Sequence, residues 1–152
     1  MVIERATVED AGEILDLQKL AYMSEAEIYN DYNIQPLRQT IEEIIDEFEV
    51  KTFLKLTQEG IIIGSVRAYV QNGTCYIGKL IVHPEYQNRG VGSSLMNEIE
   101  TYFSTSKRFE LFTGHKSLRN LYLYNKLRYK EYKREQINNN LTHVFMEKYR
   151  AT

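Results

Sequence analysis

The sequence contains little cysteine, proline or glycine. Its one cysteine, Cys75, excludes a disulfide within the chain and a cysteine-rich zinc site, and it is typical of a protein in a reducing compartment. Two prolines and eight glycines in 152 residues argue against a disordered or collagen-like chain. The length is that of one ordinary domain, so we expect residues 1–152 to form a single domain with its own core.

A surplus of one charge is also missing. Lysine and arginine total 19 against 21 aspartates and glutamates, a formal charge of −2. Nucleic-acid binding needs a basic surface, so we expect no nucleic-acid partner. Even the longest purely apolar runs are short, of which Ile61–Ile63 is typical, so we expect no membrane-spanning segment. Charges at Glu4 and Arg5 stand where a signal peptide needs an apolar core, so we expect a cytoplasmic protein without a membrane partner.

The first fifty residues predict one short strand and two helices. Residues 2–5 form the strand, and a capping-box pattern at Thr7 starts a helix with an apolar stripe from Ala11 to Ala21. Residues 24–39 have no clean period and contain Pro36, which predicts a loop. Thr40 and Glu43 then form a second capping box, which starts the next helix.

Beyond residue 50 the pattern changes to strands with two further helices. Glu59-Gly60 and Asn72-Gly73 separate apolar runs and predict tight hairpin turns. The spacing predicts strands at residues 51–58, 61–71, 74–83, 108–113, 129–137 and 141–149, and helices at residues 90–104 and 117–127. The fold class is therefore α+β, with a mixed, largely antiparallel sheet of about seven strands flanked by about four helices.

The segment KLIVHPEYQNRGVGSSLMNEI is a strand that runs through a glycine-bearing turn into a helix. Such a junction directs free backbone N–H groups and the positive end of a helix dipole at one point, which favours phosphate binding. Gly90 and Gly92 let the backbone approach an anion closely. The Walker pattern fails because Ser93 follows Gly92, and the dinucleotide fingerprint fails at Leu95.

This segment resembles the acetyl-coenzyme A signature V-x-P-x-x-Q/R-x-x-G-x-G/A of the GNAT superfamily of N-acetyltransferases. Every specified position matches in register: Val82, Pro84, Gln87, Gly90 and Gly92. A later run resembles the family's Y-x-K-x-G-F/Y pattern through Tyr124, Lys126 and Tyr129, and it departs at Arg128, where glycine is usual. A residue other than glycine there predicts a helix end that is strained or built differently.

The resemblance implies that acetyl-CoA is the co-substrate and that a primary amine of a small molecule or peptide attacks its thioester directly. The pyrophosphate is then expected on the backbone N–H groups of the turn, and the pantetheine arm along the strand edge, with an N–H of Ile81 or Val82 polarising the thioester oxygen. Asn120 is expected to contact the arm. The implied binding residues are Leu80, Ile81, Val82, Gln87, Asn88, Arg89, Gly90, Val91, Gly92, Ser93 and Asn120.

The resemblance also implies that Tyr124 protonates the departing thiolate; the alternative is a core aromatic beside Leu121, Leu123 and Leu127. No base occupies the strand where many family members carry a glutamate. Glu25 and Glu27 are the candidates for the general base, with His83 as a further one, and each has the alternative of a solvated surface residue.

The acceptor is expected beside residues 22–38, where carboxylates and tyrosines alternate and suit a cationic amine. A polyamine, an aminoglycoside-like amine, an amino acid and a protein N-terminus all remain open. The three histidines lack paired metal-ligand spacing, so no metal is expected. The alternative function is a non-catalytic acyl-CoA-binding or regulatory module, and the late strands allow a homodimer.

Overall fold

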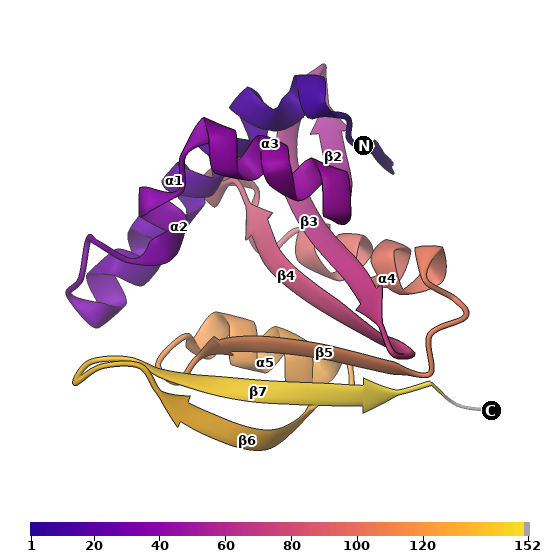
Figure 1. Ribbon diagram of the computed structural model, residues 1–152. Coiled ribbons are helices and arrows are strands. Elements are labelled where there is room, and N and C mark those ends of the chain that lie inside the picture. Colours follow the sequence, from indigo (N-terminus) through magenta and orange to yellow (C-terminus); the bar gives the residue numbers. More distant parts are fainter. Residues whose placement is uncertain (151–152) are drawn as a thin grey trace.

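The computed structural model describes residues 1–150, and its strands form one sheet of order β1-β2-β3-β4-β5-β7-β6 (Figure 1). All neighbouring strands are antiparallel except β4 and β5. The elements in chain order are β1 (Val2–Arg5), η1 (Val8–Asp10), α1 (Ala11–Tyr29), α2 (Gln35–Arg38), α3 (Ile41–Val50), β2 (Thr52–Gln58), β3 (Ile61–Gln71), β4 (Thr74–Val82), η2 (Pro84–Tyr86), α4 (Val91–Tyr102), β5 (Arg108–Gly114), α5 (Leu118–Lys126), β6 (Lys130–Gln136) and β7 (Thr142–Tyr149). The predicted mixed, largely antiparallel sheet is confirmed.

The predicted loop at residues 24–39 is wrong. Helix α1 continues to Tyr29 and ends at Asn30, which has a left-handed backbone (φ 49°), and the short helix α2 follows. The inner face of α1 carries Gln18, which is fully buried, and the half-buried Tyr22 and Glu25. These polar residues interrupt the apolar period, which is why the sequence pattern did not show the last turns of the helix.

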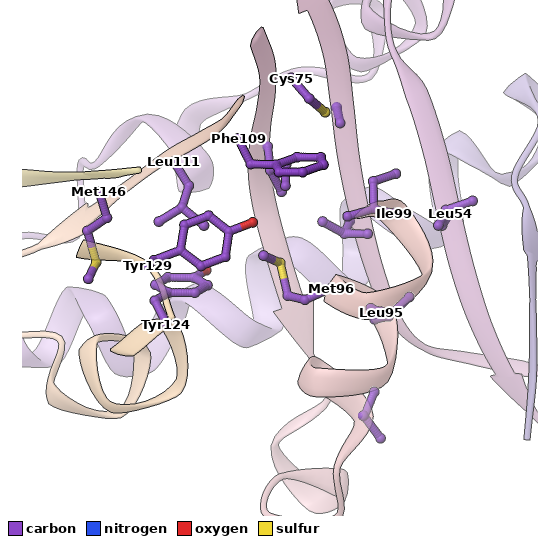
Figure 2. Close-up of a cluster of buried hydrophobic side chains, with 14 of the residues drawn as sticks. Leu54, Cys75, Leu95, Met96, Ile99, Phe109, Leu111, Tyr124, Tyr129 and Met146 are labelled. Atoms are coloured by element: carbon purple, nitrogen blue, oxygen red, sulfur yellow. The ribbon is translucent and has the colours of Figure 1, made fainter. Parts of the chain in front are cut away.

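Helices cover both faces of the sheet. Successive strand residues Phe53 and Leu54 belong to different hydrophobic clusters, so the two clusters lie on opposite faces. Helices α1 and α3 cover the cluster that contains Phe53. The larger cluster packs α4 and α5 against the sheet through residues such as Leu95 and Phe109 (Figure 2).

The sheet opens between its two parallel strands. Strands β4 and β5 pair only from Thr74–Tyr76 to Arg108–Glu110, and beyond this point they diverge (Figure 1). A bulge centred on Lys79 (φ 50°) shifts the register of β4 against β3. In the described part of the chain, residues 78–82 therefore have no strand partner on the side that faces β5.

The last strand in the sheet order, β6, is exposed at every position, so its outer edge is open. The homodimer stays a prediction.

Helix α5 closes through a left-handed arginine. Arg128 has φ 75°, and the N–H of Tyr129 donates to the carbonyl of Tyr124 at 2.9 Å. The closure that glycine usually makes is thus retained by a residue with a Cβ, at a cost of about 1 kcal/mol.

Replacing Arg128 by glycine is therefore expected to raise the free energy of unfolding by about 0.5–1 kcal/mol, as measured by urea denaturation. Lys126→Gly is the matched control, because Lys126 is helical and glycine there costs about 0.7 kcal/mol. Equal losses in both variants would show that the left-handed backbone at residue 128 carries no strain.

Candidate active-site cleft

A cleft of about 440 Å³ lies where β4 leaves β5 and runs into α4. Most of the residues expected to bind acetyl-CoA line this cleft: Leu80, Ile81, Val82, Gln87, Asn88, Gly90, Val91, Gly92, Ser93 and Asn120. Arg89 is exposed and does not line it; its guanidinium lies 5.3 Å from the ring centre of Tyr86. The N-terminal turn of α4 and one face of α5 form opposite walls.

The turn before α4 presents unpaired backbone N–H groups. Within residues 1–150, none of the N–H groups from Gln87 to Ser93 has a hydrogen-bond partner. Left-handed residues at Asn88 (φ 63°) and Gly90 (φ 80°) curl this segment, and the first turn of α4 follows directly. Consecutive free N–H groups at a helix N-terminus form a concave anion site.

The second glycine of the motif lies where α4 packs closely on its neighbours. A Cβ at Gly92 would lie 3.2 Å from the Leu123 side chain of α5 and 3.7 Å from the Leu80 side chain of β4, so only a small residue fits without shifting them. Two cationic residues of α5 lie at this cleft: Lys126, which belongs to the family's later pattern, and Arg119, which the sequence analysis does not single out. The Arg119 guanidinium donates to the Gln87 side chain across the opening, and Lys126 also lines the cleft.

A second cavity, of about 760 Å³, lies on the other side of the same opening. It is bounded by β4, β5, β7, the α1–α2 segment and the β6–β7 turn. The two cavities share five lining residues: Tyr22, Glu25, Leu80, Ser117 and Asn120. They therefore meet beside the free edge of β4.

A hydrogen-bonded chain holds Glu25 at this meeting point. Ser117 Oγ donates to Glu25 Oε2 at 2.7 Å, and Asn120 Nδ2 donates to Glu25 Oε1 at 3.3 Å. The hydroxyl of Tyr29 lies 2.7 Å from Ser117 Oγ and accepts from the Lys116 N–H at 2.9 Å. The Ser117 hydroxyl has one proton, which it donates to Glu25, so the Tyr29 hydroxyl must be the donor in its hydrogen bond with Ser117. The carboxylate is thus fixed by residues from the distant α5 region.

Tyr29 reaches this chain only because residue 114 is glycine. A Cβ at Gly114 would lie 2.0 Å from the Tyr29 hydroxyl oxygen. Burial raises the pKa of Tyr29, and burial also raises the pKa of Tyr22 to about 12. Both phenols therefore stay protonated at neutral pH, and the Tyr29 hydroxyl is able to donate to Ser117.

Tyr124 combines a core ring with a hydroxyl in the second cavity. The side chain is only 6% exposed, and its ring packs edge-on against Tyr129 in the larger hydrophobic cluster (Figure 2). Within residues 1–150 its hydroxyl has no hydrogen-bond partner, and Tyr124 lines the second cavity. Burial, with smaller contributions from Tyr22 and Glu25, raises the pKa of Tyr124, so it is a neutral donor without an acceptor.

The structure separates the base candidates. Glu25 lines both cavities, whereas Glu27 is exposed and lines neither. His83 caps the turn η2, where its Nδ1 accepts from the Glu85 N–H at 3.1 Å, and it too lines neither cavity. Only Glu25 therefore stands where the two cavities meet.

A buried ion pair lies beside the second cavity, which its arginine, Arg67, lines. Arg67 is 1% exposed, stacks on Phe53 and donates to Glu47 Oε2 at 2.9 Å. Lys51 contacts the other oxygen of Glu47 at 2.7 Å. Although burial opposes it, these two cations hold the pKa of Glu47 below its usual value.

Glu47→Gln is expected to lower the free energy of unfolding by about 2 kcal/mol, because the Arg67 charge then stays buried without a carboxylate. The depressed pKa of Glu47 means that its contribution is complete above the unfolded pKa and is lost as the pH falls through the folded pKa. Urea denaturation from pH 7 to pH 3 is the measurement. Wild type should therefore lose more stability than the variant over this range, and equal losses would contradict the role of the pair.

Two other features are absent from the described part of the chain. Residues 1–150 hold no group of three or more potential metal ligands. Over the same residues, none of the helices combines the length and the apolar character that crossing a membrane requires.

Comparison with known proteins matches residues 18–150 to the family described as an acetyltransferase (GNAT) domain. No curated protein sequence matches. Among solved structures, PaiA N-acetyltransferase from Thermoplasma acidophilum in complex with coenzyme A is 17% identical, with a TM-score of 0.78 over 99% of this chain and 100% of that chain. The ribosomal-protein-S18-alanine N-acetyltransferase from Escherichia coli is 14% identical, with a TM-score of 0.79 over 96% and 91%. At these sequence identities, the similarity to the two solved structures shows a shared fold and nothing further.

Proposed function

This chain belongs to the GNAT acetyltransferase family, and we propose that it transfers the acetyl group of acetyl-CoA to a primary amine of a small-molecule or peptide acceptor. The observation that carries the proposal is the run of unpaired N–H groups from Gln87 to Ser93, which opens into a cleft beside the free edge of β4. A phosphate ligand satisfies donors that otherwise have no partner.

Acetyl-CoA supplies the activated acetyl group, and the residues present fit its parts. The turn from Gln87 to Ser93 would hold the pyrophosphate, with Arg119 and Lys126 adding positive charge from α5. The free edge of β4 at residues 80–82 would pair with the pantetheine arm. The likeness in fold to an enzyme solved with coenzyme A supports this assignment.

Residues of both cavities supply the remaining chemistry. A backbone N–H of Ile81 or Val82 would donate to the thioester oxygen, where negative charge develops. The Tyr124 hydroxyl, which is protonated and lacks an acceptor, would give its proton to the departing thiolate. Direct attack needs the amine to lose a proton first, which requires a base on the side of the second cavity.

We assign that base to Glu25, either directly or through a water. It lines both cavities, and two donors orient its oxygens. The Tyr29 and Ser117 hydroxyls that hold it also form a continuous path of exchangeable protons. This arrangement favours an enzyme over a non-catalytic binding module, because a binding module needs neither an oriented carboxylate at the junction nor an unpaired phenol in the second cavity.

Calorimetric binding of acetyl-CoA to the full chain tests the cofactor assignment. We expect micromolar or tighter affinity for wild type and a loss of at least about 100-fold in Gly90→Glu, because the new carboxylate repels phosphate. Gly60→Glu is the matched control: Gly60 has nearly the same backbone (φ 79° against 80°) and similarly open surroundings, in the β2–β3 turn away from the cleft. It should bind acetyl-CoA like wild type.

A thiol-release assay with a panel of primary amines then separates the two functions. Release of coenzyme A that depends on an amine supports the transferase. Tight binding without release from any amine would favour the binding module, and no binding by wild type would overturn both.

A further inference from the structure

The wall of the second cavity formed by β3 and β4 carries a surplus of positive charge. Arg67 on β3 and Lys79 on β4 line the cavity there, and Lys51, just before β2, also lines it. Lys51 and Arg67 share the single carboxylate of Glu47, and Arg67 Nε is buried without a hydrogen-bond partner among the described residues. On this side of the cavity three cations thus face the one carboxylate of Glu47, in surroundings where water screens charge weakly. The other carboxylates that line the cavity belong to Glu25 of α1, to Asp31 just after α1 and to Glu110 of β5.

Lys79 is the cation without a counter-charge. It forms no ion pair or side-chain hydrogen bond with any of residues 1–150, although it is half buried. The β4 bulge gives it a left-handed backbone at the start of the free strand edge, directly before Leu80. Burial and the nearby Arg67 and Lys51 charges lower the pKa of Lys79 to about 8. An anion bound beside it would relieve this repulsion.

The opposite side of the junction carries the carboxylate of Glu25, so the cavity is negative at one place and positive at another. The residues near 22–38 alone predicted a cationic acceptor. The wall from β3 and β4, which the sequence places far from that segment, changes this expectation. Tyr69, Tyr76, Phe112 and Phe145 also line the cavity, and their aromatic rings suit an apolar portion of the acceptor.

We propose that the second cavity contains an anion subsite centred on Lys79, and that the acceptor is an amine that carries its own carboxylate or phosphate group. This inference rests on the proposed transferase function and names its substrate class. Lys79 binds the anionic group of the acceptor, while Glu25 faces the attacking amine. Polyamines, which have no anionic group, leave this subsite unsatisfied.

The test compares matched acceptors. L-leucine, L-phenylalanine, L-glutamate and L-lysine are each assayed as the free acid and as the α-amide, and O-phosphoethanolamine is assayed against ethanolamine. Lys79→Met removes the charged amine and keeps an unbranched side chain that is one atom shorter. We expect it to lower the acid-to-amide ratio of kcat/KM by about 10–100-fold, chiefly through KM. Because the amine of the acid and the amine of the amide differ in basicity, the ratio for the variant is compared with the ratio for wild type, and this difference then cancels. The two series distinguish a carboxylate from a phosphate.

Lys130→Met is the matched control, because Lys130 is exposed on β6 and lines neither cavity. It should leave the ratio unchanged. An unchanged ratio in Lys79→Met, or an equal loss with acids and amides, would overturn the anion subsite while leaving the transferase intact.

A binding measurement keeps the subsite testable if no amine in the panel is acetylated. Protein labelled with an NMR-active isotope at lysine Cε is titrated with coenzyme A present. The signal of Lys79 is the one that is missing from the spectrum of Lys79→Met. N-acetyl-L-leucine or inorganic phosphate should raise the pKa of Lys79 from about 8 toward the usual lysine value, and N-acetyl-L-leucinamide should not. A pKa that no anion moves would overturn the proposal.

Discussion

Tyr124→Phe is expected to lower kcat by about 10²–10³-fold and to change the affinity for acetyl-CoA by less than about threefold. Tyr124 lines the second cavity, which meets the coenzyme A cleft beside Leu80, and burial keeps its hydroxyl protonated. The loss has an upper bound because a thiol with a pKa near ~8.5 is already a fair leaving group. Thiol release under saturating acetyl-CoA, together with calorimetric binding, measures both quantities.

Tyr129→Phe is the matched control from the same core, and its expected effects on rate and stability are the reverse of those of Tyr124→Phe. The two rings pack together, but the Tyr129 hydroxyl donates to Glu100 Oε2 at 2.7 Å and lines neither cavity. Its loss should reduce the free energy of unfolding by about 1–2 kcal/mol without changing kcat. Tyr124→Phe should keep the stability and lose the rate. If both variants lost only stability, Tyr124 would be a core aromatic and not an acid.

The phosphate-binding turn could be predicted from the sequence because its signal is local. A strand, a turn with Gly90 and Gly92, and the start of a helix occupy neighbouring residues, and the backbone itself supplies the donors. The strands and their hairpins followed from alternation and from turn residues such as Asn72-Gly73 for the same reason.

The rest of the site could not be predicted because it is assembled across long separations. Glu25 and Ser117 are 92 residues apart, and nothing near Glu25 in the sequence indicates that it faces α5. The sequence pattern predicts a loop at the end of α1 because the inner face of the helix is polar there. The bulge at Lys79 has no sequence signal either, because a lysine with φ 50° follows a glycine that has an ordinary backbone.

Glu25→Gln is expected to reduce kcat/KM by about 10²–10³-fold at pH 7, while acetyl-CoA binding is retained. Glutamine keeps an oxygen that can accept from Ser117 but cannot take a proton from the amine. The defect should shrink as the pH rises toward the amine pKa near ~10, because the acceptor then loses its proton to solvent and needs no base. A pH profile of kcat/KM for both proteins measures this convergence.

Glu27→Gln is the matched control for the pH profile, since it removes the same charge two residues away on the exposed side of α1. Its profile should superimpose on that of wild type. If Glu25→Gln instead ran parallel to wild type at every pH, the carboxylate would act by orienting Ser117 and Asn120 and not by accepting the proton. The two outcomes differ because only a missing base is replaced by hydroxide in solution, whereas a misplaced α5 contact is lost equally at every pH.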